Sequence, residues 1–332
     1  KTNTNYAQLV EEFIRNDLTG FKRLYLKDRE IKNLILMGDF LTETIFREER
    51  QDNIITRAEF EKRYENTVYK TETSLSEEMD IDPEYAALIV PTMVICKDFM
   101  DLFNAEALWM PGVSLLDGIA YDFGEKKNFI KSAHNFENDI LVASRNIAKR
   151  YSTGKDHIKG TTDIALTIFD SMKKIHGMGA RERLLLQIAV QLHDCGKYIS
   201  MGDVAECSYQ IIMATEIIGL STEERQIIAN AVRYNTTEFV YYSEIAGEVG
   251  MDRSVYLLIA KLTAILRIAN AMDRSHYQKV KNMKAMLKDR TLLLTVDSEQ
   301  DISLELGLLM DKVEFFEEVF GIRLVFRRKR KV

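Results

Sequence analysis

Apolar residues recur at helical spacing throughout the middle of the chain. Between residues 126 and 277 five segments place apolar side chains every three or four positions, none alternates as a strand would, and no proline interrupts them. Ser221 and Glu224 form a capping-box pattern before the fourth segment. This pattern predicts an all-α domain over residues 125–277, with helices within 157–175, 181–199, 203–217, 222–234 and 255–273.

The two flanking regions have a mixed pattern. In residues 1–124 the run 31–38 is typical of a buried strand, a helix is expected after Thr56, and Asp82-Pro83 opens a long apolar helix. A short strand, a Pro-Gly turn and a second apolar helix or strand follow up to residue 124. In residues 278–332 two strands enclose a helix. The prediction is therefore an α+β multidomain protein with domains 1–124, 125–277 and 278–332.

Composition favours a soluble protein. The 332 residues are 46% hydrophobic and 29% charged, and no apolar run approaches the roughly 20 residues of a membrane helix. We see no signal peptide, and Cys96, Cys195 and Cys207 lack the CxxC spacing of a zinc site or disulfide framework. These features indicate a reducing compartment, and we expect the cytoplasm.

Both ends of the chain are unusual. The formal charge is −6, yet residues 327–331 read Arg-Arg-Lys-Arg-Lys. This tail is either a solvated terminus or part of a surface that binds a polyanion. The chain starts with Lys1 rather than Met, so we expect that it is a fragment or a shortened paralogue.

Two histidines and two aspartates form the candidate functional site. His193-Asp194 ends an apolar helix, where ionisable side chains need a partner or a metal, and His157 and Asp273 occupy helical positions on either side. Together they suit one divalent cation, with Mg²⁺ or Mn²⁺ favoured and Fe²⁺ or Zn²⁺ as alternatives. The alternative is that these residues are structural, as we interpret His134, His176 and His276.

This pattern resembles the H…HD…D motif of the HD superfamily, and Gly196-Lys197 completes its frequent HDxGK form. The resemblance implies hydrolysis of phosphoesters by metal-bound water, with Lys197 near the substrate phosphate. No histidine lies between His193 and Asp273, so the resemblance implies one metal rather than two.

The order of segments also resembles most of the exopolyphosphatase and guanosine pentaphosphate phosphohydrolase (Ppx/GppA) family. Residues 82–123 resemble its helix-strand-turn passage, and residues 181–212 resemble its "LHDIG…HSYYLI" passage. The resemblance implies the second half of an actin-like (RNase H-like) domain, an HD-type helical domain and a small C-terminal module. It implies a homodimer that acts on polyphosphate or guanosine pentaphosphate, with Lys197, Arg233 and Arg267 as phosphate-binding candidates; no specific nucleic acid or membrane partner is expected.

The departures from the family are equally specific. The two glycine-rich loops DxGSNS and DxGGGS and the catalytic Glu are missing, and of a third glycine-rich loop only Gly38 remains, followed by Asp39. Cys207 and Asn235 stand where the family has histidines. No catalytic residue is identified. Three hypotheses stay open: a Ppx/GppA phosphatase without its phosphate loops, an HD-type metal-dependent phosphohydrolase acting on a nucleotide or phosphomonoester, and a non-catalytic polyphosphate-binding or regulatory protein.

Overall fold

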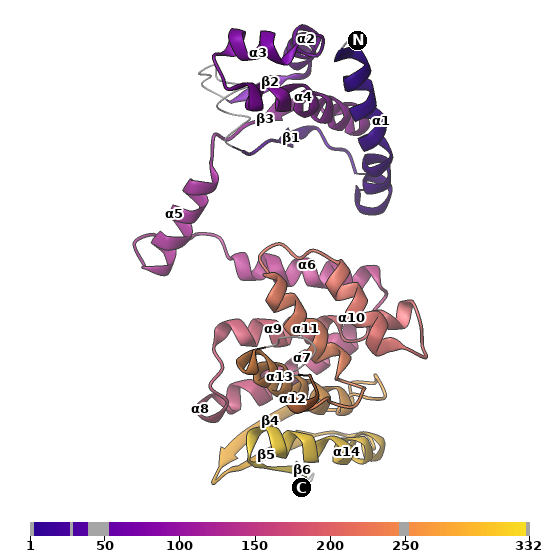
Figure 1. Ribbon diagram of the computed structural model, residues 1–332. Coiled ribbons are helices and arrows are strands. Elements are labelled where there is room, and N and C mark those ends of the chain that lie inside the picture. The colour runs from indigo at the N-terminus through magenta and orange to yellow at the C-terminus, as the bar shows by residue number, and fades with distance from the viewer. Residues whose placement is uncertain (1–2, 27–28, 39–52, 246–251, 330–332) are drawn as a thin grey trace. The chain divides into compact units, whose positions relative to one another are not determined.

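The computed structural model describes residues 3–26, 29–38, 53–245 and 252–329, which form two compact units (Figure 1). The first unit comprises residues 1–133 and the second residues 134–332. The predicted boundary at 124/125 falls inside helix α5 (Leu115–Lys126), which belongs to the first unit. The fold is mixed α and β, as predicted, and mostly helical.

The first unit packs helices around a small three-stranded sheet. Strands β1 (Asn33–Ile35), β3 (Ala107–Trp109) and β2 (Ile54–Thr56) lie in the order β1-β3-β2, with β1 parallel and β2 antiparallel to β3. The other elements are α1 (Asn3–Phe21), a π-helical turn (Lys22–Leu26), α2 (Arg57–Thr67), α3 (Glu72–Met79) and α4 (Pro83–Phe103). Helix α1 was not predicted, and Asp39 lies outside the described residues.

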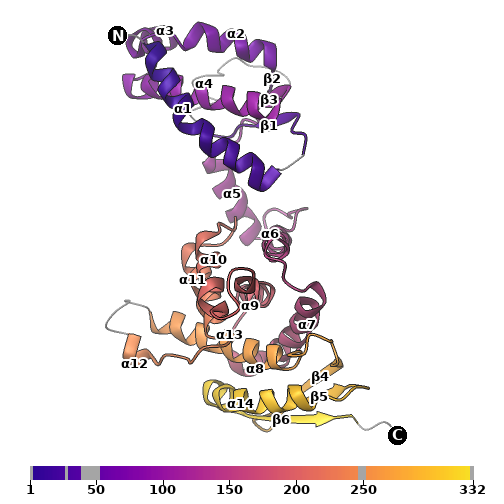
Figure 2. The same ribbon diagram turned by 90° about the vertical axis from the view of Figure 1, so that its right-hand side faces the viewer.

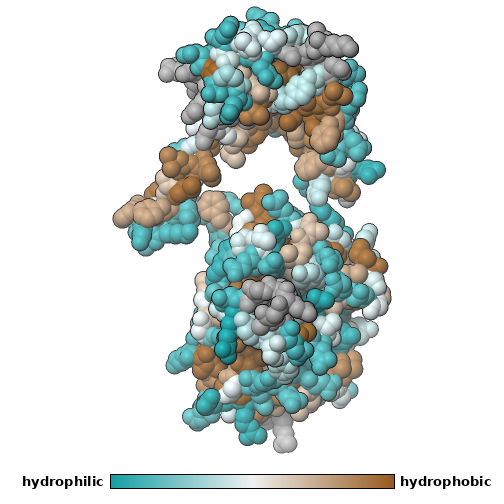
Figure 3. Space-filling model, viewed as in Figure 1, coloured by the Kyte–Doolittle hydropathy of each residue, from teal (hydrophilic) through white to brown (hydrophobic). Residues whose placement is uncertain are grey.

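Helix α4 is the core element of this unit and begins where the sequence predicts. The Asp82 side chain accepts a hydrogen bond from the Glu84 amide at 2.8 Å, and Pro83 follows at the first helical position. The helix ends at Phe103, and the C-cap residue Asn104 adopts a left-handed φ of 53°. Thr56 and Glu59 likewise form the capping box of α2. In contrast, α5 exposes most of its apolar side chains, which Figure 3 shows gathered over this helix.

The second unit is a helical bundle around α13 (Arg253–Ala271). Its helices are α6 (Phe136–Arg150), α7 (Lys155–Ser171), α8 (Lys173–His176), α9 (Ala180–Leu192), α10 (Val204–Ala214), α11 (Thr222–Arg233) and α12 (Tyr242–Ile245). By length and composition α13 could cross a membrane, although no run of this kind was expected from the sequence. Most of its side chains are buried in the bundle core, the usual position of such a helix in a folded domain.

The C-terminal residues add a sheet and a helix to the same hydrophobic core. Strands β4 (Lys281–Lys288), β5 (Thr291–Asp297) and β6 (Arg323–Arg328) follow the order β4-β5-β6, and α14 (Ser303–Phe320) packs against α13 (Figure 2). Asp289 and Arg290 both adopt positive φ and connect β4 to β5 in a two-residue turn. Strand β4 was not predicted, because three lysines interrupt its apolar pattern.

Alternation along β5 decides which face of this sheet the core covers. Leu294 is fully buried, whereas Leu293 on the opposite face is only partly buried. We predict that Leu294→Ala lowers the free energy of unfolding of this unit by about 2 to 5 kcal/mol, and that the matched control Leu293→Ala lowers it by less than about 1 kcal/mol. Urea denaturation of both variants measures this. Equal losses would show that the register is wrong.

Candidate metal centre

Three chain segments bring the four predicted residues together in the second unit. His157 lies in the first turn of α7, His193 follows the last residue of α9, Asp194 precedes the 3₁₀ helix Cys195–Tyr198, and Asp273 comes just after α13. His157, His193 and Asp273 are each at least 97% buried, and Asp194 is slightly more accessible. Helix ends therefore deliver polar groups to one point of an otherwise apolar core.

Each of the two imidazoles uses one ring nitrogen to fix its orientation. His157 Nδ1 lies 2.8 Å from Asp273 Oδ2, and His193 Nδ1 lies 2.7 Å from the Val190 carbonyl oxygen. A carbonyl oxygen can only accept, so the His193 Nδ1 must donate its proton. The carboxylate of Asp273 favours the same tautomer of His157. When both rings are neutral, both Nε2 atoms are then left with lone pairs.

Those two lone pairs face the same space. His157 Nε2 and His193 Nε2 are 3.2 Å apart, and burial is the main cause that lowers the pKa of His193, so this ring stays neutral near pH 7. Two acceptors at this distance repel each other unless a cation or proton lies beside them. A metal–nitrogen distance of about 2.1 Å would place two ligand atoms about 3.0 to 3.4 Å apart.

Asp194 provides a third ligand atom. Its Oδ2 is 4.0 Å from His157 Nε2, and its Oδ1 is 3.6 Å from His193 Nε2. Burial acts to raise the pKa of Asp194, but opposing effects, among them the contact with the Lys197 ammonium, outweigh it and hold the pKa below its usual value. His157, His193 and Asp194 thus form a group that could hold a divalent ion.

Asp273 was predicted as a fourth ligand, and the structure places it on the far nitrogen of His157. Its Oδ1 accepts a hydrogen bond from the Gln278 backbone amide at 2.8 Å, and its Oδ2 lies 3.2 Å from Gln278 Nε2. These contacts fix the carboxylate that orients His157. Direct coordination of a metal by Asp273 stays a prediction.

His276 is a site residue that sequence reasoning missed. Its ring stacks on that of His157, with 3.6 Å between centroids and 3° between planes, and its Nε2 lies 3.8 Å from Asp194 Oδ2. His276 and Gln278 both adopt left-handed backbone conformations, φ 59° and 47°, which are costly for residues other than glycine. The available signal was its position three residues after Asp273, in the turn that follows α13.

Lys197 approaches the same group. Its ammonium lies 2.5 Å from Asp194 Oδ2. The side chain is partly accessible. Phosphate binding by Lys197 stays a prediction.

The two arginines proposed for phosphate lie away from this arrangement. Arg233 pairs with Glu206 at 3.0 Å and covers the ring of Tyr209. Arg267 is 91% buried and donates hydrogen bonds to the carbonyl oxygens of Tyr234 and Thr237, at 2.7 and 2.6 Å. The guanidinium of Arg267 therefore supports the fold, and its contacts do not favour phosphate binding.

Two histidines interpreted as structural have partners away from the centre. His134 Nε2 contacts Asp139 at 2.5 Å near the surface. His176 is buried, and its Nε2 donates to the Phe169 carbonyl oxygen at 3.0 Å.

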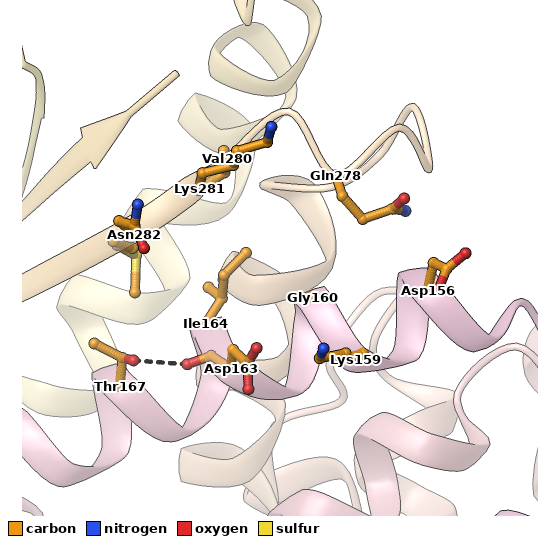
Figure 4. A pocket seen from close by; sticks show the side chains of 11 residues that line it. Asp156, Lys159, Gly160, Asp163, Ile164, Thr167, Gln278, Val280, Lys281 and Asn282 are labelled. Atoms are coloured by element: carbon orange, nitrogen blue, oxygen red, sulfur yellow. Dashed lines mark hydrogen bonds between the residues drawn. The ribbon is translucent and has the colours of Figure 1, made fainter. Parts of the chain in front are cut away.

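A groove of about 560 Å³ lies beside α7, on the Gln278 side of Asp273 (Figure 4). Asp156, Lys159 and Asp163 line it from the helix, and Lys281 lines it from the start of β4. These four side chains balance in charge. His157, His193 and Asp194 do not line this groove, so we do not include it in the metal centre.

Close packing around Gly196 explains why the HDxGK motif has a glycine at this position. A Cβ at this position would lie 2.3 Å from the Val204 carbonyl oxygen and 2.6 Å from the Ser208 amide nitrogen, both backbone atoms that cannot move alone. The Gly196 amide also donates to Ser208 Oγ at 2.9 Å, which joins the centre to α10.

We predict that Gly196→Ala costs about 2 kcal/mol or more of unfolding free energy, whereas Gly202→Ala, whose added Cβ would meet nothing closer than 3.9 Å, changes it by less than about 0.5 kcal/mol. Thermal unfolding followed by circular dichroism compares the two variants. A Gly196→Ala protein as stable as wild type would show that α10 does not pack as closely as described.

Comparison with known proteins extends this picture. A family model, Ppx/GppA phosphatase domain III, matches residues 142–314, slightly more than half of the chain, and this range contains all the residues of the centre. No curated protein matches the chain. The family expected from the sequence is confirmed: the chain belongs to the Ppx/GppA phosphatase family.

Proposed function

We propose that the second unit binds one divalent metal ion through His157, His193 and Asp194 and hydrolyses a phosphoester or phosphoanhydride beside it. The observation that carries the proposal is the pair of Nε2 atoms, 3.2 Å apart, in rings whose Nδ1 atoms are already committed. If the two buried histidines were purely structural, at least one of the two facing Nε2 atoms would carry a proton and donate it to an acceptor.

The residues of the chain have separate roles in this proposal. Asp273 holds the His157 tautomer, and the Val190 carbonyl holds that of His193. A divalent ion at this position would polarise a phosphate oxygen and lower the pKa of a water molecule. The Lys197 ammonium lies 2.5 Å from Asp194 and would move partly toward a bound phosphate, whose negative charge it would stabilise. His276 covers one face of His157 and limits the directions from which substrate approaches.

Family membership supports the substrate class. Within it we propose polyphosphate or guanosine pentaphosphate as substrates and Mg²⁺ or Mn²⁺ as the metal, with another phosphomonoester or nucleotide as the alternative. We further propose that the first unit is the second half of an actin-like domain and that the protein is a cytoplasmic homodimer. The free thiols of Cys96, Cys195 and Cys207 support a reducing compartment.

A non-catalytic role is the second candidate, and the Lys197–Asp194 contact favours it. An ammonium 2.5 Å from the carboxylate can neutralise Asp194 in place of a metal, leaving a centre that binds phosphate without chemistry. Metal analysis distinguishes the two candidates.

We predict that the purified chain retains about one equivalent of Mn²⁺ after dialysis, since three ligand atoms converge without rearrangement. His193→Ala should lose the metal. His134→Ala, a histidine outside the centre, is the matched control and should keep it. Inductively coupled plasma mass spectrometry measures the content; wild-type protein without metal would leave only the non-catalytic candidate.

We also predict that metal-dependent release of phosphate from p-nitrophenyl phosphate, polyphosphate or guanosine pentaphosphate falls at least about a hundredfold in His193→Ala, and about tenfold in Lys197→Ala, which removes one charge but no ligand. The comparison is the kcat/KM of each variant with that of His134→Ala. Turnover that survives His193→Ala would locate the chemistry outside this centre.

A further inference from the structure

The outer face of the C-terminal sheet carries four cations in a regular array. Register places Lys284 beside Thr295 and Arg327, and it places Lys288 beside Thr291 and Arg323. All four cations are exposed, and none has an ion pair or hydrogen bond from its side chain to another described residue. With strands about 4.8 Å apart and about 3.3 Å per residue, they mark a rectangle of about 10 by 13 Å.

An apolar row crosses the middle of this rectangle. Met286, Leu293 and Val325 are paired across the three strands, and Met286 and Val325 are 57% and 40% exposed. The opposite face of the sheet, with Leu292, Leu294 and Leu324, is buried in the core. The helices of this unit therefore cover one face and leave the outer face, which we call the cationic sheet face, to solvent (Figure 2).

Charge on this face contrasts with the rest of the chain. The whole protein has a formal charge of −6, and the acidic residues nearest in the strand pattern are Asp289 in the hairpin turn and Asp297 at the opposite end of β5. Strand β6 ends at Arg328, Lys329 follows, and the sequence continues with further cations. Such a concentration of positive charge on an acidic protein attracts polyanions.

We propose that the cationic sheet face binds single-stranded RNA without sequence preference. Four cations at the corners contact phosphates of the backbone, and Met286, Leu293 and Val325 between them offer an apolar surface to the faces of the bases. Inorganic polyphosphate has no group that would use this apolar row. A lipid surface fits less well, because the apolar side chains are shorter than the lysines and arginines around them and cannot pass beyond them into hydrocarbon.

The test is fluorescence anisotropy of a labelled oligouridylate with the full chain. Removing the four charges together (Lys284→Gln, Lys288→Gln, Arg323→Gln and Arg327→Gln) should weaken binding at least about tenfold and flatten the salt dependence, whose wild-type slope should be about −3 for four phosphate contacts on a single strand. The matched control removes four exposed cations elsewhere: Lys62→Gln, Lys131→Gln, Lys174→Gln and Arg253→Gln. It should bind as wild type does. Circular dichroism verifies that both variants fold.

A second variant tests the apolar row. Met286→Thr with Val325→Thr should weaken binding of the oligouridylate about tenfold while leaving binding of polyphosphate unchanged, because only the nucleic acid places bases on this row. Equal binding by wild type and the fourfold variant would overturn the proposal. A double Thr variant that binds both polymers as wild type does would also overturn it, because the face would then bind any polyanion without preference. Binding of the wild type to anionic vesicles but not to oligouridylate would overturn it as well. None of these outcomes depends on the metal centre.

Discussion

The orientation of two buried imidazoles is the constraint on which the functional centre depends. Each ring commits Nδ1 to an acceptor, Asp273 for His157 and the Val190 carbonyl for His193, and the two Nε2 atoms are left 3.2 Å apart. Burial lowers the pKa of His193, so protonation does not readily relieve the repulsion between the lone pairs. A cation held by these atoms and Asp194 does relieve it. The stability of the metal-free centre and its affinity for metal are thus linked. The repulsion between the two lone pairs destabilises the metal-free protein, and its relief by a bound ion adds to the binding free energy.

The surrounding fold maintains this arrangement through helix ends rather than through a loop. His157, His193 and Asp273 each lie at or next to a helix terminus, where backbone groups are available and the packing of α7, α9 and α13 fixes the positions. Gly196 allows α10 to approach closely behind His193 and Asp194. The left-handed residues His276 and Gln278 close the turn around Asp273. Backbone strain therefore collects beside the centre, as is common at functional sites.

The sequence predicted the parts of this structure that depend on local periodicity. Five helices of the second unit (α7, α9, α10, α11 and α13), the Asp82-Pro83 start of α4 and the capping box at Ser221 follow from spacing and cap chemistry, whereas α6 was not among the predicted segments. Strand β4 was missed because its lysines face solvent on a sheet edge and break the apolar pattern. The roles of His276, Asp273 and Arg267 depend on contacts between segments far apart in the chain, which residue spacing does not reveal. The His276 ring stacks on His157, and the Asp273 carboxylate contacts Nδ1 of His157. The Arg267 guanidinium donates hydrogen bonds to backbone carbonyl oxygens.

Histidine tautomers are the most direct test of the central claim, because the facing lone pairs exist only if both rings carry their proton on Nδ1. Long-range ¹H–¹⁵N correlation spectra of the metal-free protein with labelled histidine report the protonation of each ring nitrogen, with His157→Ala and His193→Ala for assignment. We predict neutral rings for both residues, each protonated at Nδ1, and loss of the free Nε2 signals when a diamagnetic divalent ion, Zn²⁺ or Mg²⁺, is added to the metal-free protein at saturation. A proton on Nε2 of either ring near neutral pH would contradict the account, since the pair would then satisfy itself by a hydrogen bond and need no metal.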